Sequence, residues 1–363
     1  MTGDPAPGTP LDRLDTPALV VDMALAEANI ARMQRFVAAQ GKRLRAHAKF
    51  HKSAYWAAKQ LAAGASGICV AKLGEAEALA AGGIGDILVA NEVTGAIKVE
   101  RLVALAARAK ITVAIDDPAN AREISAAAAA RGVTVGALVD VNVRLNRCGV
   151  EPGAPTAALA RTIADLPGLR YEGLMGYEGH VRGDADERRA QTLAAMGRLE
   201  EAVVATTAAG LPPRIVSAGG TSNYAIGATV PCVTELQCGS YLFMDATYHA
   251  EVPEFPPALW VVASVMSRPA PDRAILDAGF KAISEQFGPP RLEGPPGATL
   301  LRLNAEHAIV QLEGEARRLR VGDRVRLLPS KTETTINLHA EYFCARDGVL
   351  EAVVLIDARG RFR

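Results

Sequence analysis

The sequence predicts an α/β protein in which a (β/α)8 barrel is followed by a smaller β-rich domain. Three observations support this fold class. Short apolar runs alternate with alanine-rich amphipathic segments from residue 18 to about residue 245, as strands and crossover helices do in a barrel. The helical pattern ends after Tyr248, where Pro253, Pro256 and Pro257 interrupt the chain. The length of 363 residues suits one barrel-sized domain and a smaller one.

The predicted barrel begins after an opening strand at residues 18–22 and a helix at residues 23–40. The eight barrel strands are expected at residues 44–50, 68–72, 87–91, 112–116, 137–141, 173–177, 215–218 and 235–238. Helices are expected between them at residues 75–81, 97–107, 119–130, 157–163 and 185–208. An open doubly wound sheet is the alternative. It is less favoured because no Gly-x-Gly-x-x-Gly loop follows the first strand.

The second predicted domain consists of strand-like runs without helical periodicity. These runs lie at residues 259–266, 274–278, 308–311, 324–328 and 350–356, with a Pro/Gly-rich loop at residues 287–297. We therefore place the barrel at residues 18–248 and the β-rich domain at residues 249–363. Residues 1–17 are expected to pack with the β-rich domain.

The composition argues against several classes of partner. Forty basic and forty acidic residues cancel, so neither nucleic acid nor an anionic membrane surface is expected to bind. No apolar run reaches the ~18 residues of a membrane-spanning helix. The five cysteines are odd in number and scattered, mostly in apolar segments, which is typical of reduced thiols in a cytoplasmic protein.

The most informative segment lies at the end of the first barrel strand. Apolar residues alternate there with four basic residues, which are Arg45, His47, Lys49 and His51. This pattern places Lys49 on the same side of the strand as a guanidinium and two imidazoles. Neighbouring positive charge and partial burial favour the neutral amine, the form that makes a Schiff base with a carbonyl. A solvated basic strand face is the alternative interpretation.

Polar residues also follow the later strands, at the end of a barrel where active sites form. They are Asn142, Arg144, Asn146 and Arg147; Tyr177, Glu178 and His180; Gly219, Gly220, Thr221 and Ser222; and Gly239, Ser240 and Tyr241. The last two groups combine glycine with hydroxyl side chains after the final two strands, where barrels commonly hold phosphate. Ordinary turns also use glycine and serine, but two such turns at the two expected strands favour a phosphate site.

Seven segments, spread over nearly the whole chain, resemble a known enzyme family. They are DTPAL (15–19), HAKFHKS (47–53), AKLGEA (71–76), NRCGV (146–150), GYEGH (176–180), GGT (219–221) and TELQCGSY (234–241). The chain resembles the D-threonine aldolase and D-3-hydroxyaspartate aldolase group, to which the eukaryotic-type D-serine dehydratase is related. These are fold-type III enzymes of pyridoxal 5'-phosphate, related more remotely to alanine racemase. The resemblance therefore implies an alanine racemase-like barrel that binds this cofactor.

The resemblance also implies a role for each matching residue. Lys49 matches the lysine that forms the internal aldimine with the cofactor, and Arg147 matches the arginine beside its phenolic oxygen. Tyr177 matches an aromatic residue near the cofactor ring, and His180 matches the histidine that acts as base. The matches to the phosphate-binding segments are Gly220, Thr221, Gly239 and Ser240, with Tyr241 next to them. Family members are typically homodimers with the active site near the subunit interface.

The metal site of the family is the clearest departure. A His-x-Asp or His-x-Cys pair precedes a Thr-x-Asn-Leu segment in the family, whereas Lys331 and Glu333 occupy these positions here. A protonated lysine cannot bind a divalent cation and one carboxylate is a poor site, so we assign no metal ligands. Three explanations are open: Lys331 supplies the positive charge, other groups such as His180 bind the metal, or the chemistry differs. A second departure is Ala71, where many relatives carry a glutamine.

The resemblance implies a lyase that acts on small D-β-hydroxy amino acids. The expected reaction is retro-aldol cleavage to glycine and an aldehyde. Dehydration of a D-3-hydroxy amino acid and racemisation of a D-amino acid are the catalytic alternatives. A non-catalytic protein that binds pyridoxal phosphate is a third possibility, but proteins of that class are single barrels, and the separate β-rich domain argues against it.

Overall fold

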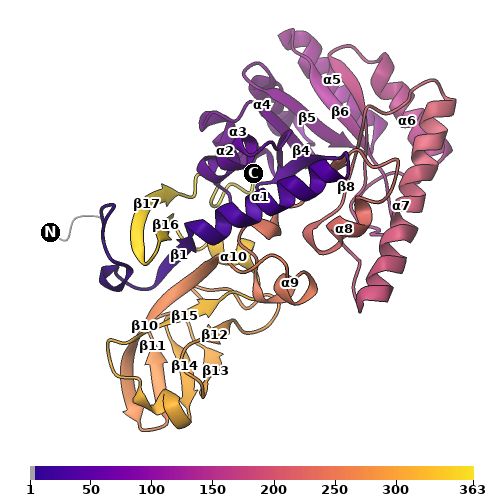
Figure 1. The fold of residues 1–363 in the computed structure, drawn as a ribbon. Helices are drawn as coiled ribbons and strands as arrows, with labels where there is room; N and C mark the ends of the chain where they lie inside the picture. The colour runs from indigo at the N-terminus through magenta and orange to yellow at the C-terminus, as the bar shows by residue number, and fades with distance from the viewer. Residues whose placement is uncertain (1–4) are drawn as a thin grey trace. The chain divides into compact units, whose positions relative to one another are not determined.

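The computed structural model describes residues 5–363, and these residues form two compact units (Figure 1). The β-rich unit contains residues 5–31, 50–53 and 240–359, and the barrel unit contains residues 32–49, 54–239 and 360–363. The prediction placed residues 18–31, 50–53 and 240–248 with the barrel, whereas their contacts group them with the β-rich unit. Residues 360–363, which were predicted to lie in the β-rich domain, group with the barrel unit. Part of the expectation for residues 1–17 falls on residues 1–4, which lie outside the described residues.

Eight parallel strands close into a barrel, which confirms the predicted fold class. The strands are β2 (Arg43–His47), β3 (Gly67–Val70), β4 (Asp86–Glu92), β5 (Lys110–Ile115), β6 (Val135–Asp140), β7 (Leu169–Met175), β8 (Ile215–Ala218) and β9 (Glu235–Leu236). The last strand closes the barrel by pairing with the first, with Arg43 opposite Glu235 and Leu44 opposite Leu236. Every polar group that follows one of these strands therefore emerges at the same end of the barrel.

The barrel interior is filled by side chains from successive strands. One core cluster consists of Cys69, Leu88, Ala114, Leu138 and Met175, one residue from each strand between β3 and β7. These side chains are almost completely buried, with at most 3% exposed. The interior of the barrel is thus a packed core.

Helices between the strands cover the outside of the barrel (Figure 1). They are α2 (Ala54–Ala62), α3 (Leu73–Ala81), α4 (Ala96–Ala106), α5 (Pro118–Arg131), α6 (Ala154–Asp165), α7 (Ala185–Ala208) and α8 (Tyr224–Gly227), while α1 (Met23–Ala39) precedes the barrel. Local sequence explains where several begin. Asp117 accepts the first backbone N–H groups of α5 ahead of Pro118, and Asp184 and Glu187 form a capping box at the start of α7.

The β-rich unit is built on one mixed sheet with the order β13-β14-β11-β10-β1-β16-β17, in which β15 pairs with β10 and β12. Its strands are β1 (Ala18–Asp22), β10 (Leu259–Ala270), β11 (Arg273–Leu276), β12 (Arg291–Glu293), β13 (Ala298–Leu303), β14 (Ala308–Leu312), β15 (Arg324–Leu328), β16 (Glu341–Arg346) and β17 (Val349–Leu355). The short helices are α9 (Ala246–Glu251) and α10 (Thr332–Ile336). The opening strand β1 therefore belongs to this sheet, because it pairs with β10 and β16.

The N-terminal segment also bonds within the β-rich unit. The backbone N–H of Gly8 donates to the carbonyl of Leu350, and the Arg324 guanidinium donates to the carbonyl of Leu11.

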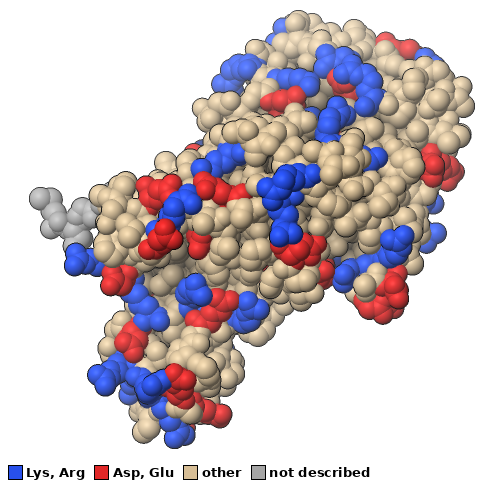
Figure 2. All heavy atoms as spheres, in the orientation of Figure 1, with Lys and Arg blue, Asp and Glu red and all other residues tan. Residues whose placement is uncertain are grey.

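Acidic and basic side chains are interspersed on the face of the molecule shown in Figure 2. Within residues 5–363, no helix combines the length and apolar character that crossing a membrane requires.

Candidate active site

The structure corrects the interpretation of the segment around Lys49. Strand β2 ends at His47, and Lys49 lies in the turn that follows. Arg45 was expected to lie beside Lys49, but its buried guanidinium forms ion pairs with Glu235 at 2.9 Å and Asp86 at 2.7 Å. The charge of Arg45 is therefore balanced by two carboxylates of the barrel strands, and Arg45 has a structural role there.

The two predicted imidazoles order the turn around Lys49. Nδ1 of His47 accepts a hydrogen bond from the backbone N–H of Lys49 at 3.4 Å. In the β-rich unit, Nδ1 of His51 accepts one from the backbone N–H of Ser53 at 3.2 Å. Both rings are at least nine-tenths buried. They therefore hold the backbone on either side of Lys49 and Phe50.

Three predicted residues meet in one cavity of about 350 Å³ in the barrel unit. They are Lys49, Arg147 and Tyr177. The cavity is also lined by His47, Ala71, Lys72, Ala90, Asn91, Cys148, Met175, Gly219 and Gln237. Because the lining combines a primary amine, a guanidinium and an aromatic ring, it can hold an aromatic aldehyde that carries negative charge.

Tyr177 gives this cavity its aromatic face. The ring centroid lies 5.5 Å from Nζ of Lys49 and 5.6 Å from Cζ of Arg147. Both cations are therefore within the range of a cation–π interaction with the same ring.

The loop that presents Arg147 is organised by Asn142. Oδ1 of Asn142 accepts hydrogen bonds of 3.1 Å from the backbone N–H groups of both Arg144 and Asn146. The same two residues have positive φ angles of 81° and 54°. These side-chain bonds stabilise a backbone shape that most residues avoid, so the predicted Asn-rich run acts by shaping the loop.

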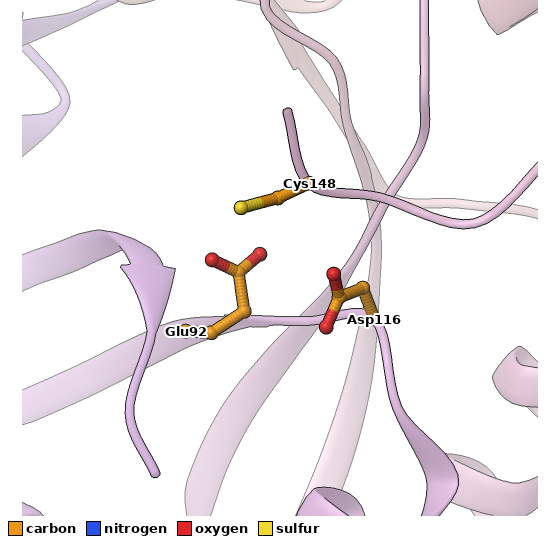
Figure 3. Close-up of side chains that lie close together, drawn as sticks. All are labelled: Glu92, Asp116 and Cys148. Carbon is orange, nitrogen blue, oxygen red and sulfur yellow. The ribbon is translucent and has the colours of Figure 1, made fainter. Parts of the chain in front are cut away.

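An acidic cluster that we did not predict lies next to Arg147. Glu92, Asp116 and Cys148 place one side-chain oxygen or sulfur each within 4.8 Å of the others (Figure 3). Asp116 also accepts a hydrogen bond from the backbone N–H of Gly149 at 3.0 Å. Glu92 ends β4 and Asp116 follows β5, so a complete survey of strand ends would have found both carboxylates.

Burial and the carboxylates of this cluster raise the pKa values of Asp140 and Cys148. Burial, followed by the carboxylates of Glu92 and Asp116, raises the pKa of Asp140 to about 8, and the positive charge of Arg147 opposes the shift. Burial and Glu92 similarly raise the pKa of Cys148 to about 11. The thiol is therefore protonated at neutral pH, and the group offers negative charge beside Arg147.

The glycine turn after β8 is held by a buried carboxylate. Gly219, with a φ of +84°, donates its backbone N–H to Glu178 at 3.3 Å, and Gly220 donates to Oδ1 of Asn223 at 2.9 Å. Asn223 in turn donates to Glu178 at 2.6 Å. Burial raises the pKa of Glu178 to about 7. Thr221 is buried at the start of the short 3-10 helix η2 (Thr221–Asn223).

The second predicted turn lies at the division between the units. Gly239 belongs to the barrel unit, and Ser240 and Tyr241 belong to the β-rich unit. Ser240 begins the 3-10 helix η3 (Ser240–Leu242). The Tyr241 ring is fully buried and packs edge-on against Phe255 with the ring centroids 5.9 Å apart. The phosphate-binding role of these residues stays a prediction.

His180 lies in the loop after β7, outside the lining of the 350 Å³ cavity. Its Nδ1 is buried and has no hydrogen-bond partner within residues 5–363. Burial, and after it the charges of Arg144 and Arg182, lower the pKa of His180 from its usual value near 6.5. The imidazole is therefore neutral near pH 7, which is the state a general base requires.

A larger hollow of about 850 Å³ lies elsewhere on the barrel unit. It is bordered by α3, α4 and the C-terminal residues 360–363. Two of its charged groups, Glu77 and Arg101, form an ion pair of 2.6 Å with each other. The smaller cavity is the better candidate, because Lys49, Arg147 and Tyr177 all line it and its lining contains no carboxylate to neutralise them.

The side chains that line the cavity, and those at the family's metal position, indicate which cofactors fit. An amine, a guanidinium, an aromatic ring and a glycine turn within one cavity fit pyridoxal phosphate. A divalent metal does not fit at the position that the family resemblance indicated. Lys331 is 4% exposed there, and its ammonium lies 3.2 Å from Glu333. A protonated amine has no lone pair to offer an ion.

Comparison with known proteins places these features in a family. Residues 21–247 match the family described as alanine racemase, N-terminal domain, and residues 258–345 match the putative serine dehydratase domain. The chain is 42% identical to a D-threonine aldolase from Arthrobacter sp over 98% of this chain and 95% of that protein. It is 37% identical to a 3-hydroxy-D-aspartate aldolase from Paracoccus denitrificans (strain Pd 1222), again over 98% and 95%.

Solved structures agree with these similarities. A crystal structure of a D-threonine aldolase from Filomicrobium marinum matches with a TM-score of 0.96 and 37% identity, covering 100% of both chains. A D-threo-3-hydroxyaspartate dehydratase from Delftia sp. HT23 matches with a TM-score of 0.86 and 32% identity, over 96% of this chain and 98% of that one. The expected alanine racemase-like architecture is therefore confirmed.

Proposed function

This chain belongs to the family of D-threonine and 3-hydroxy-D-aspartate aldolases, and we propose that it cleaves D-β-hydroxy amino acids to glycine and an aldehyde with pyridoxal 5'-phosphate as cofactor. The observation that supports this most directly is the cavity in which Lys49, Arg147 and Tyr177 meet. Its substrate would be a small amino acid, since the space is about 350 Å³.

Pyridoxal phosphate held in this cavity would supply an electron sink for the negative charge that develops at the substrate's Cα. The protein then has to hold it and to select which bond breaks. Arg147 places a fixed positive charge against an anionic oxygen of the ligand, and Tyr177 offers a ring face to both cations. Gly220, Thr221, Gly239 and Ser240, next to Tyr241, are proposed to hold the phosphate.

His180 is proposed as the base for the substrate's β-hydroxyl group. In retro-aldol cleavage the hydroxyl proton moves to the base, the oxygen electrons form the aldehyde C=O, and the Cα–Cβ electron pair goes to Cα. A neutral imidazole can accept that proton, and the environment of His180 favours the neutral form. The Nδ1 atom, which bonds to no group among residues 5–363, offers a second position for holding the proton or a water.

Product analysis with D-threonine and D-3-hydroxyaspartate tests the proposal. Glycine together with an aldehyde is the expected result. A 2-oxo acid with ammonia would instead identify a dehydratase, the second candidate, which the similarity to a D-threo-3-hydroxyaspartate dehydratase favours. Appearance of the enantiomer would identify a racemase. Binding of the cofactor without any product would identify a non-catalytic protein.

The family resemblance also leads us to propose a homodimer. Light scattering on the purified holoenzyme checks this directly, and a single species with the mass of one 38.1 kDa chain would refute it.

The five free cysteines support a cytoplasmic location for the enzyme, since reduced thiols persist in that compartment.

A further inference from the structure

Gln237 lines the 350 Å³ cavity with a side chain that is bonded to the protein at both of its polar atoms. The residue directly follows β9 and is 8% exposed. Its Nε2 donates to Oγ of Ser217 at 2.9 Å, and its Oε1 accepts a hydrogen bond from Sγ of Cys69 at 3.3 Å. All three residues belong to the barrel unit. The orientation of this amide is therefore set by its neighbours within that unit.

A buried ion pair determines the direction of the hydrogen bond between Ser217 and the amide. Nε of Arg45 can only donate, and it lies 2.9 Å from Oε1 of Glu235. The hydroxyl of Ser217 donates to the same carboxylate oxygen at 2.9 Å. Ser217 has a single hydroxyl proton, so its oxygen can only accept from Gln237. The nitrogen of the Gln237 amide, and not its oxygen, therefore faces Ser217.

The thiol of Cys69 favours the same orientation at the other end of the amide. Cys69 is fully buried in the core of the barrel. Burial raises the pKa of this thiol, so Sγ keeps its proton at neutral pH and can donate it to Oε1 of Gln237. A flipped amide would place its oxygen against the oxygen of Ser217 with no proton between the two. Both ends of the side chain thus select one orientation.

This orientation leaves one N–H of the amide for a ligand. Nε2 carries two hydrogens, and within residues 5–363 only Ser217 accepts one of them. A buried donor without an acceptor is unfavourable. The lining of the cavity contains no carboxylate that could accept the second N–H. The acceptor therefore has to come from what fills the cavity.

We propose that Gln237 donates this N–H to an acceptor atom on the ring of bound pyridoxal phosphate. Glu235 and Ser217 act as positioning residues, and so does Cys69, because they keep the amide in its donating orientation. This inference rests on the cofactor named in the proposed function. The contact selects a ring atom that carries no proton, since a protonated atom would meet a second donor. An amide provides this contact without adding charge to the cavity.

Cofactor retention and the visible absorption band test the donor itself. Gln237→Met removes the amide and keeps a side chain of similar length. We expect its holoenzyme to lose pyridoxal phosphate roughly 10-fold faster than the native holoenzyme during dialysis, because one hydrogen bond to the ligand is missing. The band of the cofactor that remains should be shifted, since the acceptor belongs to the conjugated ring. Asn120→Leu, which removes a buried amide that donates to the carbonyl of Val93, is the matched control and should behave as the native protein.

Substitutions beneath the amide test the positioning residues. Ser217→Ala removes the acceptor for Nε2 together with the link to Glu235, and Cys69→Ala removes the donor to Oε1. Both should speed cofactor loss and shift the band in the same direction as Gln237→Met but by less, because the amide remains and can rotate. Cys69→Ser keeps a donor at this position and should restore the native band. A merely structural role of Cys69 would not distinguish serine from alanine in this way.

Two results would overturn the proposal. Native retention together with a native band in Gln237→Met would show that the amide does not touch the cofactor. A changed Gln237→Met beside native behaviour of Ser217→Ala and Cys69→Ala would show that these residues do not position it.

Far-ultraviolet circular dichroism checks that each variant is folded. If Gln237→Met fails to fold, Gln237→Glu replaces it, since a carboxylate has the same size and no donor. If Ser217→Ala fails to fold, the comparison of Cys69→Ala with Cys69→Ser decides the positioning role. A coloured native holoenzyme that forms no aldehyde would refute the aldolase reaction alone, because retention and the band are measured without turnover.

Discussion

The side-chain amide of Asn223 donates a 2.6 Å hydrogen bond to the carboxylate of Glu178, and both residues hold the glycine turn after β8. Glu178 accepts the backbone N–H of Gly219, and Asn223 accepts that of Gly220. Two buried side chains from separate loops therefore determine the position of the turn that is proposed to bind phosphate. Neither side chain has to touch the cofactor to affect its binding.

Asn223→Ala should therefore weaken cofactor retention more than it weakens the fold. Removing the amide leaves the Gly220 N–H and one Glu178 oxygen without partners, so the turn loses its fixed shape. The measurement is the fraction of pyridoxal phosphate left after dialysis. Asn120→Ala is the matched control, because its buried amide donates to the carbonyl of Val93 elsewhere in the barrel unit. Equal retention by the two variants would contradict the prediction.

Glu178→Gln should flatten the pH dependence of stability. Burial raises the pKa of Glu178 from 4.5 to about 7, so the stability it contributes is complete below pH 4.5 and is lost as the pH rises through 7. Each unit by which the pKa of a group differs between the folded and the unfolded protein corresponds to about 1.4 kcal/mol in the free energy of unfolding. Urea unfolding is measured at pH 5 and pH 8. Between these pH values the free energy of unfolding should fall less for the variant than for the native protein. A loss of the same size in both would refute this assignment.

His180→Asn should lower kcat about 10²- to 10⁴-fold while the cofactor's absorption band persists, because a general base contributes on that scale. The pKa of His180 is lowered, so the acid limb of the native pH–rate profile should fall below pH 6.5 and should be absent in the variant. The control is His307→Asn in the β-rich unit, for which native kinetics are expected. Near-native turnover in His180→Asn would exclude His180 as the base.

Lys49→Ala should abolish the visible absorption band of the protein reconstituted with pyridoxal phosphate, because the variant has no amine to bond to the aldehyde in this turn. Turnover should be lost as well, and far-ultraviolet circular dichroism should be unchanged. Lys98→Ala, at an exposed position of α4, is the control and should keep both band and activity. A colourless native protein after reconstitution would remove the basis of the cofactor assignment.

Glu92→Gln should make the protein more stable at pH 9 than the native form, with little difference at pH 5. The carboxylate of Glu92 helps to raise the pKa of Asp140 from 3.8 to about 8, so the stability contributed by Asp140 is lost as the pH rises through 8. Removing one negative charge from the cluster reduces that loss. Chemical unfolding at both pH values is the measurement, with Glu100→Gln on the surface of α4 as control. A greater fall in the free energy of unfolding from pH 5 to pH 9 in Glu92→Gln than in the native protein would contradict this prediction.

Much of the fold was predictable because it depends on local periodicity. The eight barrel strands lie close to the expected positions, and β8 (Ile215–Ala218) has the same bounds in the prediction and in the structure. Short apolar runs separated by amphipathic helices specify this arrangement, since each run must be buried and each helix must cover it. Lys49, Arg147 and Tyr177 were found for a related reason, because residues at strand ends share one end of a barrel.

The sequence by itself thus determined the barrel, the β-rich second part and the three residues that line one cavity. The tertiary structure decided which charges meet. Arg45 bonds to Glu235, 190 residues away along the chain, and Lys331 is enclosed by rings from residues 50, 248 and 287. No local pattern encodes such contacts, because they depend on how distant strands and loops converge. The convergence places buried charges beside specific partners, and those partners decide whether a basic residue is structural or available to a ligand.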